Sequence, residues 1–342
     1  MKHPQTIRRL GFTLIEILVV IAIIAVLASI LLPALQKVQE TAKKTKTSSL
    51  MQAFARACDE FALDHGRYPG LIPDSAVNGT NITSTQNALL ELMGGARAVN
   101  TQSPQTVLNE YNEFAANSTY SVPVTDPASG LVWSIAFNES RFGEGPWING
   151  RAYEPYFSPK SSDLKYVPFD TDNSALFEYP SLVDAWDIPI IYLRAGRKNG
   201  VIIDDAVNGR LPQFDLPGMN DYFQDAINTN GSIIGPSISP NDQTRIAWLT
   251  LLLAHPTFWE IDASNAGSEF DMGTAWGTSR GRYMLLSAGP DNIYLEISNE
   301  QVHLNQEIDS QSPTSSLLTP TDGTVTPKMM ETFDDVVVYG GA

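Results

Sequence analysis

A single carboxylate interrupts a long apolar run near the start of the sequence. Phe12 to Leu35 are apolar at nearly every position, and the one acidic residue among these 24 is Glu16. A carboxylate within a membrane-spanning helix costs several kcal/mol unless it is neutralised, and such a residue is functional by default. Glu16 is therefore the first candidate for chemistry, and that chemistry is charge pairing.

Three environments can accommodate the carboxylate. A free amine at Phe12, in the same chain or in a neighbour, would neutralise Glu16 directly if the chain were cut after Gly11. The first turn of a helix beginning there would also favour the negative charge through the macrodipole. Alternatively, Glu16 extends to the membrane surface with no specific partner. The residues alone leave these alternatives open.

The apolar run is long enough to cross a bilayer. At about 1.5 Å per residue, 24 residues span about 36 Å, against a hydrocarbon core of about 30 Å. A secretory signal peptide has a shorter apolar region with a small-residue cleavage site after it. Here the candidate site, Gly11-Phe12, lies before the run. We expect residues 1–11 to be a leader and residues 12–35 a transmembrane helix.

The distribution of basic residues gives mixed evidence on orientation. Lys2, Arg8 and Arg9 favour a cytoplasmic N-terminus. Four lysines follow the run and favour the opposite orientation: Lys37, Lys43, Lys44 and Lys46. Because large domains cross the membrane largely regardless of charge, we predict that the N-terminus faces the cytoplasm and the rest of the chain lies outside.

The segment Gly11-Phe-Thr-Leu-Ile-Glu16, after a short basic leader and before an apolar helix, resembles the prepilin cleavage and methylation motif of type IV pilins and type II secretion pseudopilins. The resemblance implies that a prepilin peptidase cuts after Gly11 and methylates Phe12. It implies that Glu16 neutralises the terminal amine of an adjacent subunit during assembly. Pro33 corresponds to the helix-breaking proline of pilins.

The same resemblance implies a cellular setting. The partners would be the prepilin peptidase, other pilin or pseudopilin subunits, the secretion-system platform and the inner membrane. The protein would be a single-pass inner-membrane protein with a periplasmic or extracellular C-terminal domain.

An amphipathic helix is predicted to continue the transmembrane helix over residues 36–65. Its apolar positions recur at three- and four-residue steps: Val38, Ala42, Leu50, Ala53, Phe54, Ala57, Cys58, Phe61 and Ala62. The steps keep no strict heptad, which disfavours a coiled coil. Gly66 and Pro69 end the helix. We expect residues 66–342 to form the globular extracytoplasmic domain.

Composition limits the functions of this domain. The 342 residues carry a formal net charge of −16, which disfavours nucleic-acid binding. The one cysteine, Cys58, excludes an intrachain disulfide and is expected to be a small buried apolar residue. Ser/Thr/Pro-rich residues 305–328 are typical of a flexible excursion.

A helix followed by short strands predicts an α+β, pilin-like fold, in which the long helix packs on an antiparallel sheet domain with large loop insertions. We interpret residues 71–130 as loop-rich, with one helix near Gln86–Met93, and residues 208–245 as a second insertion. The predicted strands are 131–137, 188–193, 201–203, 283–287, 294–297 and 336–339. The apolar residues 246–253 fit either a buried helix or a strand.

Three further segments resemble the major pseudopilin of type II secretion. They are Asp184-Ala-Trp-Asp-Ile-Pro-Ile-Ile-Tyr192, Ser287-Ala-Gly-Pro-Asp291 and Asp334-Asp335-Val336. The chain departs from that pattern at Ala185, which replaces proline, and at Asp187 and Asn292, which each replace glycine. It is also much longer. The sequence thus looks like an enlarged relative of that subunit.

Calcium is the cofactor that this second resemblance implies. Carried over, its ligands would be Asp291 with Asp334 and Asp335, helped by loop carbonyls, because Ca²⁺ takes six to eight oxygen ligands. Alternatively, Asp291 only stabilises a turn. Other oxygen donors that can substitute are Asp271, Glu296 and Asn299.

The residues give little support for an enzyme. The four histidines have no zinc-like spacing, and no phosphate-binding loop occurs. We therefore predict a structural subunit of a type II secretion pseudopilus or a type IV pilus-like filament. The alternative is a minor or adhesive pilin whose enlarged domain binds a surface ligand or carbohydrate. An enzyme on a pilin-like anchor is the third and weakest reading.

Overall fold

The computed structural model describes eleven parts of the chain, and the statements below concern only these. They are residues 14–77, 82–100, 120–126, 129–168, 178–197, 202, 213–214, 252–255, 279–291, 294 and 335–341. Contacts divide the chain into two compact units, residues 1–45 and residues 46–342. Each unit is described by itself.

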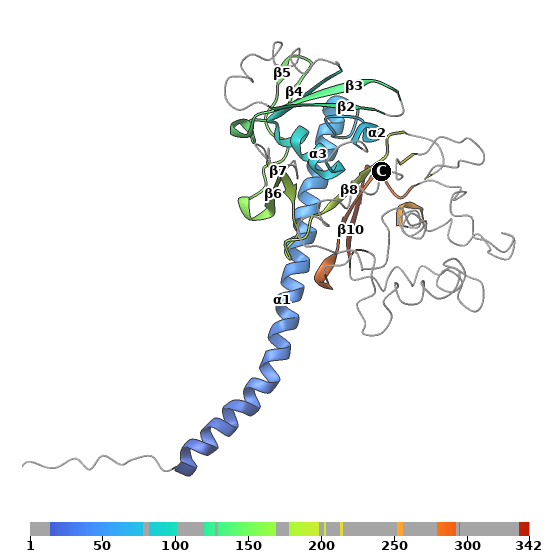
Figure 1. The fold of residues 1–342 in the computed structure, drawn as a ribbon. Coiled ribbons are helices and arrows are strands. Elements are labelled where there is room, and N and C mark those ends of the chain that lie inside the picture. The colour runs from blue at the N-terminus through green and yellow to red at the C-terminus, as the bar shows by residue number, and fades with distance from the viewer. Residues whose placement is uncertain are drawn as a thin grey trace, which may run out of the picture. The chain divides into compact units, whose positions relative to one another are not determined.

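The dominant element is α1, Leu14–His65, drawn in blue in Figure 1. Its large apolar side chains from Leu14 to Leu27, and again from Leu31 to Leu35, are 48–81% exposed in the single chain. Among the described residues it is the one helix that is long and apolar enough to cross a membrane. The helix ends where the sequence predicted, at Gly66, whose φ of +71° suits glycine.

The C-terminal part of α1 contributes to the core of the second unit. Met51, Phe54, Cys58 and Phe61 are fully buried. Thr47 is buried as well, whereas Val38, Ala42 and Ala53 are exposed. The predicted apolar stripe is therefore buried or half-buried in the second unit from Leu50 onwards, apart from Ala53, whereas its two earlier residues are exposed in the single chain.

The described residues of 71–130 contain more regular structure than the loop-rich interpretation predicts, while residues 78–81, 101–119 and 127–128 lie outside the described residues. This stretch contains α2 (Asp74–Val77), α3 (Ser84–Met93), β1 (Ala96–Asn100) and β2 (Tyr120–Thr125). The predicted helix near 86–93 is confirmed as α3, and it begins two residues earlier because Thr83 and Gln86 form a capping box. All ten residues of α3 are buried, so its polar side chains bond inside the domain.

The described strands form four small antiparallel sheets. One has the order β1-β3-β2, with β3 at Val132–Phe137. Another has the order β10-β9-β8, with strands Val336–Gly340, Tyr283–Ser287 and Ile191–Arg194. Two hairpin-like pairs complete the set: β4 (Trp147–Ile148) with β5 (Arg151–Ala152), and β6 (Leu164–Pro168) with β7 (Glu178–Leu182).

Among the described residues, three short 3₁₀ segments lie between these elements: η1 (Glu139–Arg141), η2 (Ser161–Asp163) and η5 (Gly289–Asp291). The long helix with its antiparallel sheets confirms the predicted α+β, pilin-like fold.

Within the described part of the second unit, two apolar clusters form the core. The larger joins α1 to α3 and to the sheet of β9, through Phe54, Leu89, Tyr192 and Leu285 among others. The smaller lies between α2, α3 and the sheet of β1 and β3, and it includes Ile82, Ile135 and Tyr179. Helix α3 is therefore the element that both sheets share.

The predicted strands agree with the structure to different degrees. Those at 131–137, 283–287 and 336–339 are confirmed with bounds that differ by one residue at most. The strand predicted at 188–193 begins only at Ile191, because residues 184–188 form a turn. The strand predicted at 201–203 is wrong at Ile202, its one described residue, which lies in a bend. Residues 305–328 and nearly all of 208–245 lie outside the described residues.

Candidate assembly and metal-binding sites

The predicted assembly site is described only in part. Glu16 lies in the first turn of α1 and is exposed in the single chain. Gly11 and Phe12 lie outside the described residues, so the pairing of Glu16 with an amine stays a prediction. Pro33 lies inside α1, which continues through it. A carboxylate in a first turn is favoured by the helix dipole, in agreement with one of the expected environments.

The segment beginning at Asp184 folds into a tight turn around a buried carboxylate. Asp184 Oδ1 accepts hydrogen bonds from the backbone N–H groups of Trp186 at 2.8 Å and Ile188 at 3.0 Å. The backbone N–H of Ala185, the residue that follows Asp184, donates to Thr47 Oγ1 on α1 at 3.1 Å. This side chain thus fixes the turn from within, while the turn is fastened to the start of the buried part of α1.

The same carboxylate joins two of the segments that the sequence singled out. Ser287 Oγ, at the end of β9, donates to Asp184 Oδ2 at 2.7 Å. Burial raises the pKa of Asp184, and the hydrogen bonds from Ser287, Ile188 and Trp186 oppose that rise. The carboxylate of Asp184 accepts three hydrogen bonds from the described residues, so its role here is structural.

The departure at Asp187 has a structural meaning. Its φ is +66°, in the left-handed region where glycine is favoured. Glycine, which the resembling pseudopilin segment carries at this place, would suit this conformation better than aspartate does. Asp187 is exposed.

Strand register places two of the predicted metal ligands at one end of a sheet. In the antiparallel pair of β9 and β10, Ser287 lies opposite Val336. Asp335 directly precedes Val336, and Asp291 ends the segment η5 that follows β9. Antiparallel partners bring the end of one strand to the start of the other. The backbones of Asp291 and Asp335 therefore leave the sheet at the same edge.

The metal prediction itself is not tested. Asp334, Asp271, Glu296 and Asn299 lie outside the described residues. Within the parts of the chain that the structure describes, no group of three His, Cys, Asp or Glu residues is arranged to hold a metal ion. The two backbone positions are compatible with the oxygen donors that calcium takes, and calcium stays a proposal.

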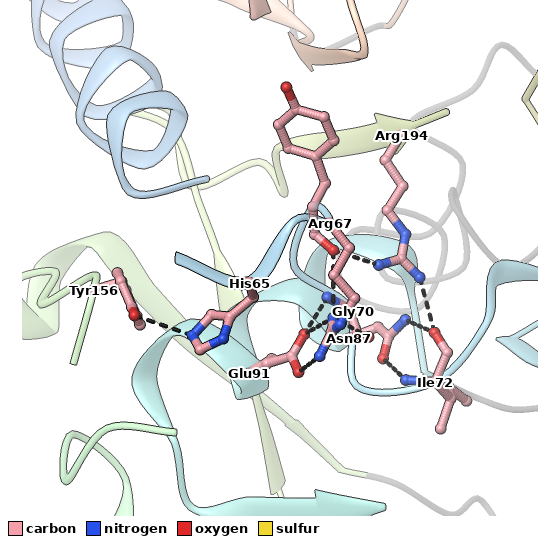
Figure 2. A network of polar contacts seen from close by, with 9 residues as sticks. His65, Arg67, Gly70, Ile72, Asn87, Glu91, Tyr156 and Arg194 are labelled. Atoms are coloured by element: carbon pink, nitrogen blue, oxygen red, sulfur yellow. Dashed lines mark hydrogen bonds and ion pairs between the residues drawn. The ribbon is translucent and has the colours of Figure 1, made fainter. Parts of the chain in front are cut away.

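A polar network that sequence reasoning missed fixes the chain just after α1 (Figure 2). The guanidinium of Arg67 pairs with the carboxylate of Glu91 on α3, and Gly70 N donates to Glu91 Oε2 at 2.6 Å. Asn87, one turn away, accepts from Ile72 N at 3.0 Å and donates to Ile72 O at 2.9 Å. Helix α3 thus binds the backbone of residues 70–72 from one side.

Arg194 of β8 fixes the same segment through a second ion pair. Its Nε lies 2.8 Å from Asp74 Oδ2, and its two terminal nitrogens donate to Tyr68 O and Ile72 O. Burial opposes the positive charge, yet the pairing with Asp74 raises the pKa of Arg194. A Cβ on Gly70 would lie 1.9 Å from Arg194 Nη1, so a side chain at this position would displace the guanidinium from its partners. No local pattern predicts this pair, because its members are 120 positions apart.

A second aromatic and polar cluster surrounds the end of α1. His65 Nε2 lies 3.1 Å from the hydroxyl of Tyr156, which donates to Asp64 Oδ2 at 2.6 Å. The His65 ring packs on Phe61 and Tyr153. These contacts fasten residues 153–157 to the helix and show no arrangement of a nucleophile with a base.

Comparison with protein families finds a known motif near the N-terminus. Residues 7–32 match the model of the prokaryotic N-terminal methylation motif. The match contains Gly11, Phe12 and Glu16, the residues for which the sequence predicted processing and assembly. The resemblance is thus confirmed for this part of the chain.

Curated relatives agree with the motif. The chain is 47% identical over 62 residues to "Type II secretion system core protein G" of Klebsiella pneumoniae, covering 18% of this chain and 44% of that protein. It is 47% identical over 64 residues to the protein of the same name from Escherichia coli K12, covering 19% and 44%. It is also 42% identical over 60 residues to "Fimbrial protein" of Neisseria meningitidis, covering 18% and 35%.

The chain thus matches less than half the length of these curated relatives. The match involves about a fifth of this chain, which is the longer protein. Their names describe a secretion-system component and a fimbrial protein rather than enzymes, in agreement with the prediction of a structural, non-enzymatic protein. No solved structure matches the chain.

Proposed function

We propose that this chain is a structural subunit of a type II secretion pseudopilus or a type IV pilus-like filament, processed by a prepilin peptidase and assembled through its N-terminal helix. The observation that carries the proposal is the match of residues 7–32 to the N-terminal methylation motif, at the start of a helix apolar enough to span a membrane. The acidic α+β domain that follows supplies the extracytoplasmic body of the subunit.

Charge pairing supplies the assembly step. Cleavage after Gly11 creates a positively charged amine at Phe12, four positions before Glu16. In a low-dielectric membrane, a carboxylate and an ammonium of adjacent subunits attract strongly, and each offsets the other's cost of leaving water. A subunit without Glu16 would lose this attraction and leave its neighbour's amine unpaired.

The experiment compares two glutamates of the same helix. In cells that make the filament, the Glu16→Ala chain should still be processed but should be absent from sheared filaments. Glu40→Ala is the matched control, since Glu40 is exposed on α1 beyond the apolar run, and it should assemble normally. Incorporation of Glu16→Ala at the level of the control would contradict the assembly role.

Calcium is the second element of the proposal. Asp291, Asp334 and Asp335 would hold the ion with loop carbonyls at the edge where β9 ends and β10 begins, and calcium there would tie the C-terminal strand to the 287–291 loop. A ligand that binds only the folded state raises the unfolding temperature. We expect calcium to raise it and a chelator to lower it in wild type but not in Asp291→Asn; equal curves with and without calcium would contradict the site.

A second candidate function, binding of a surface carbohydrate, is favoured by one observation. Trp147 on β4 is 39% exposed, and the guanidinium of Arg97 lies 4.4 Å from the centre of its ring. An exposed indole beside a cation suits an acidic sugar. A glycan array probed with the wild-type and Trp147→Ala proteins separates the two functions, since only an adhesive subunit should give binding that depends on Trp147.

A further inference from the structure

Charge is distributed very unevenly along the chain. Residues 47–342 hold 15 of the 22 Lys and Arg and 36 of the 38 Asp and Glu, a formal charge of 15 − 36 = −21. By contrast, four lysines and one glutamate fall within residues 36–46, directly after the apolar run ends. A strongly acidic domain is thus tethered through a short basic helical segment.

One of the four lysines has a role inside the domain. Lys46 Nζ lies 3.1 Å from Oδ1 of Asp163, a buried carboxylate. The other three, Lys37, Lys43 and Lys44, belong to the first unit, residues 1–45, and are exposed or half-exposed. Lys44 also lies 3.6 Å from Glu40, in an exposed i,i+4 pair of the kind worth only about 0.3–0.5 kcal/mol.

Helix geometry places these three ammonium groups close to a bilayer surface. Lys37 lies two residues beyond Leu35 and Lys44 nine, so their backbones stand about 3 Å and about 13 Å past the apolar run. Headgroups occupy about 5–7 Å on each side of the hydrocarbon core. Every Cα–Cβ bond of a helix tilts toward its N-terminus, so the long lysine side chains lean back toward the membrane.

The lysines leave the helix in two directions rather than one. Lys37 and Lys44 are seven residues apart and share a face, whereas Lys43 is turned by about 100° from Lys44. A single partner surface would meet one face, but lipid headgroups surround the helix. The arrangement is therefore complementary to phosphates that lie on more than one side of the helix.

We propose that Lys37, Lys43 and Lys44 form a basic collar that binds the phosphate groups of anionic phospholipids in the leaflet from which the helix emerges. The inference rests on the membrane anchorage in the proposed function. Its consequence is electrostatic: an acidic domain is repelled by an anionic surface, and the collar offsets that repulsion where the chain leaves the bilayer.

The test measures which lipids the protein retains. The full chain is placed in nanodiscs of equal parts phosphatidylglycerol and phosphatidylethanolamine, released in mild detergent, and its bound lipids are counted by native mass spectrometry. The leader's basic residues are common to all variants. We expect wild type to retain more phosphatidylglycerol than the triple variant Lys37→Gln/Lys43→Gln/Lys44→Gln, by at least about fivefold, the ratio that corresponds to the about 1 kcal/mol contributed by a single lysine.

Two further variants control for overall charge. The triple variant Lys160→Gln/Lys165→Gln/Arg197→Gln removes the same charge from the domain and should retain lipid as wild type does. Glu40→Gln removes the opposing charge of the collar and should increase the retention of phosphatidylglycerol. The difference between wild type and the collar variant should also vanish in about 1 M salt, where the Debye length is about 3 Å.

The outcomes separate this inference from the proposed function. Failure of the wild-type chain to enter the nanodiscs would overturn the anchorage and the inference with it. Insertion with equal retention by wild type and the collar variant would overturn the inference alone. So would a collar variant that retains phosphatidylglycerol normally but loses self-association, because the lysines would then bind the acidic domain of a second copy.

Discussion

The hydroxyl of Ser287 donates to the carboxylate of Asp184 at 2.7 Å, across 103 positions of sequence. Both residues are buried, and each begins one of the segments that resemble the major pseudopilin. The turn at 184–188 and the loop at 287–291 are therefore parts of one structure centred on Asp184. It lies at the end of the sheet where β9 ends and β10 begins.

Loss of this contact should destabilise the domain. A hydrogen bond to a buried charged group contributes about 1.5–3 kcal/mol, so Ser287→Ala should lower the free energy of unfolding by about 2 kcal/mol. Denaturant unfolding of the full chain in detergent measures it. The matched control is Ser84→Ala: Ser84 Oγ is buried and has no partner in the described chain, so this variant should be neutral. Equal effects of the two variants would contradict the role of Ser287.

Asp184 should also leave a signature in the pH dependence of stability. Burial raises its pKa in the folded state, so the folded protein binds a proton more readily than the unfolded chain does. This contribution to stability is present below the unfolded pKa of about 3.9 and is lost as the pH rises through the folded pKa. Relative to Asp184→Asn, wild type should therefore gain stability as the pH falls from neutral towards about 4. A constant difference between the unfolding free energies of wild type and Asp184→Asn over that range would contradict a raised pKa of Asp184 in the folded state.

The turn offers a stabilising substitution. Asp187 has a φ of +66°, and the left-handed conformation costs a residue with a Cβ about 1–2 kcal/mol. Asp187→Gly should raise the free energy of unfolding by about 1 kcal/mol, less the entropy that glycine adds to the unfolded chain. Asp187→Val is the opposing control, because a β-branched residue tolerates this conformation worst. The prediction fails if both variants shift the unfolding midpoint in the same direction.

Arg194 should be among the most sensitive residues of the domain. Arg194→Met leaves the Asp74 carboxylate buried without its partner, and breaking a buried ion pair from one side costs about 3–5 kcal/mol. The double variant Arg194→Met/Asp74→Asn removes both charges and should recover part of that loss, which a double-mutant cycle in denaturant measures. Additive effects of Arg194→Met and Asp74→Asn would contradict a specific pair.

Local signals made α1, α3 and the strands β3, β9 and β10 predictable from sequence. The apolar run, the three- and four-residue spacing and the glycine after His65 locate α1, and short runs rich in apolar residues locate the strands. The β4–β5 hairpin had a readable signal that was missed: Asn149-Gly150, with φ of +51° and +77°, forms a two-residue turn with both residues left-handed.

Other features depend on contacts that no local pattern encodes. Strands β6 and β7 pair residues that local periodicity does not relate, such as Lys165 with Ser181. Helix α3 looks too polar to be central, yet its polar side chains bond to distant backbone, as when Thr85 Oγ1 donates to Ile190 O at 2.8 Å. The functional residues Gly11, Phe12 and Glu16 were predicted from a short motif that lies at a fixed distance from the apolar run. A motif of this kind can be recognised without knowledge of tertiary contacts.

Mass spectrometry of the intact protein, extracted from membranes of cells that contain a prepilin peptidase, tests the central claim most directly. We predict a polypeptide that begins at Phe12 and carries one additional methyl group on its terminal amine. A mature chain that still begins at Met1, or one cut after Leu35 and released from the membrane, would leave Glu16 without its partner and contradict the proposed function.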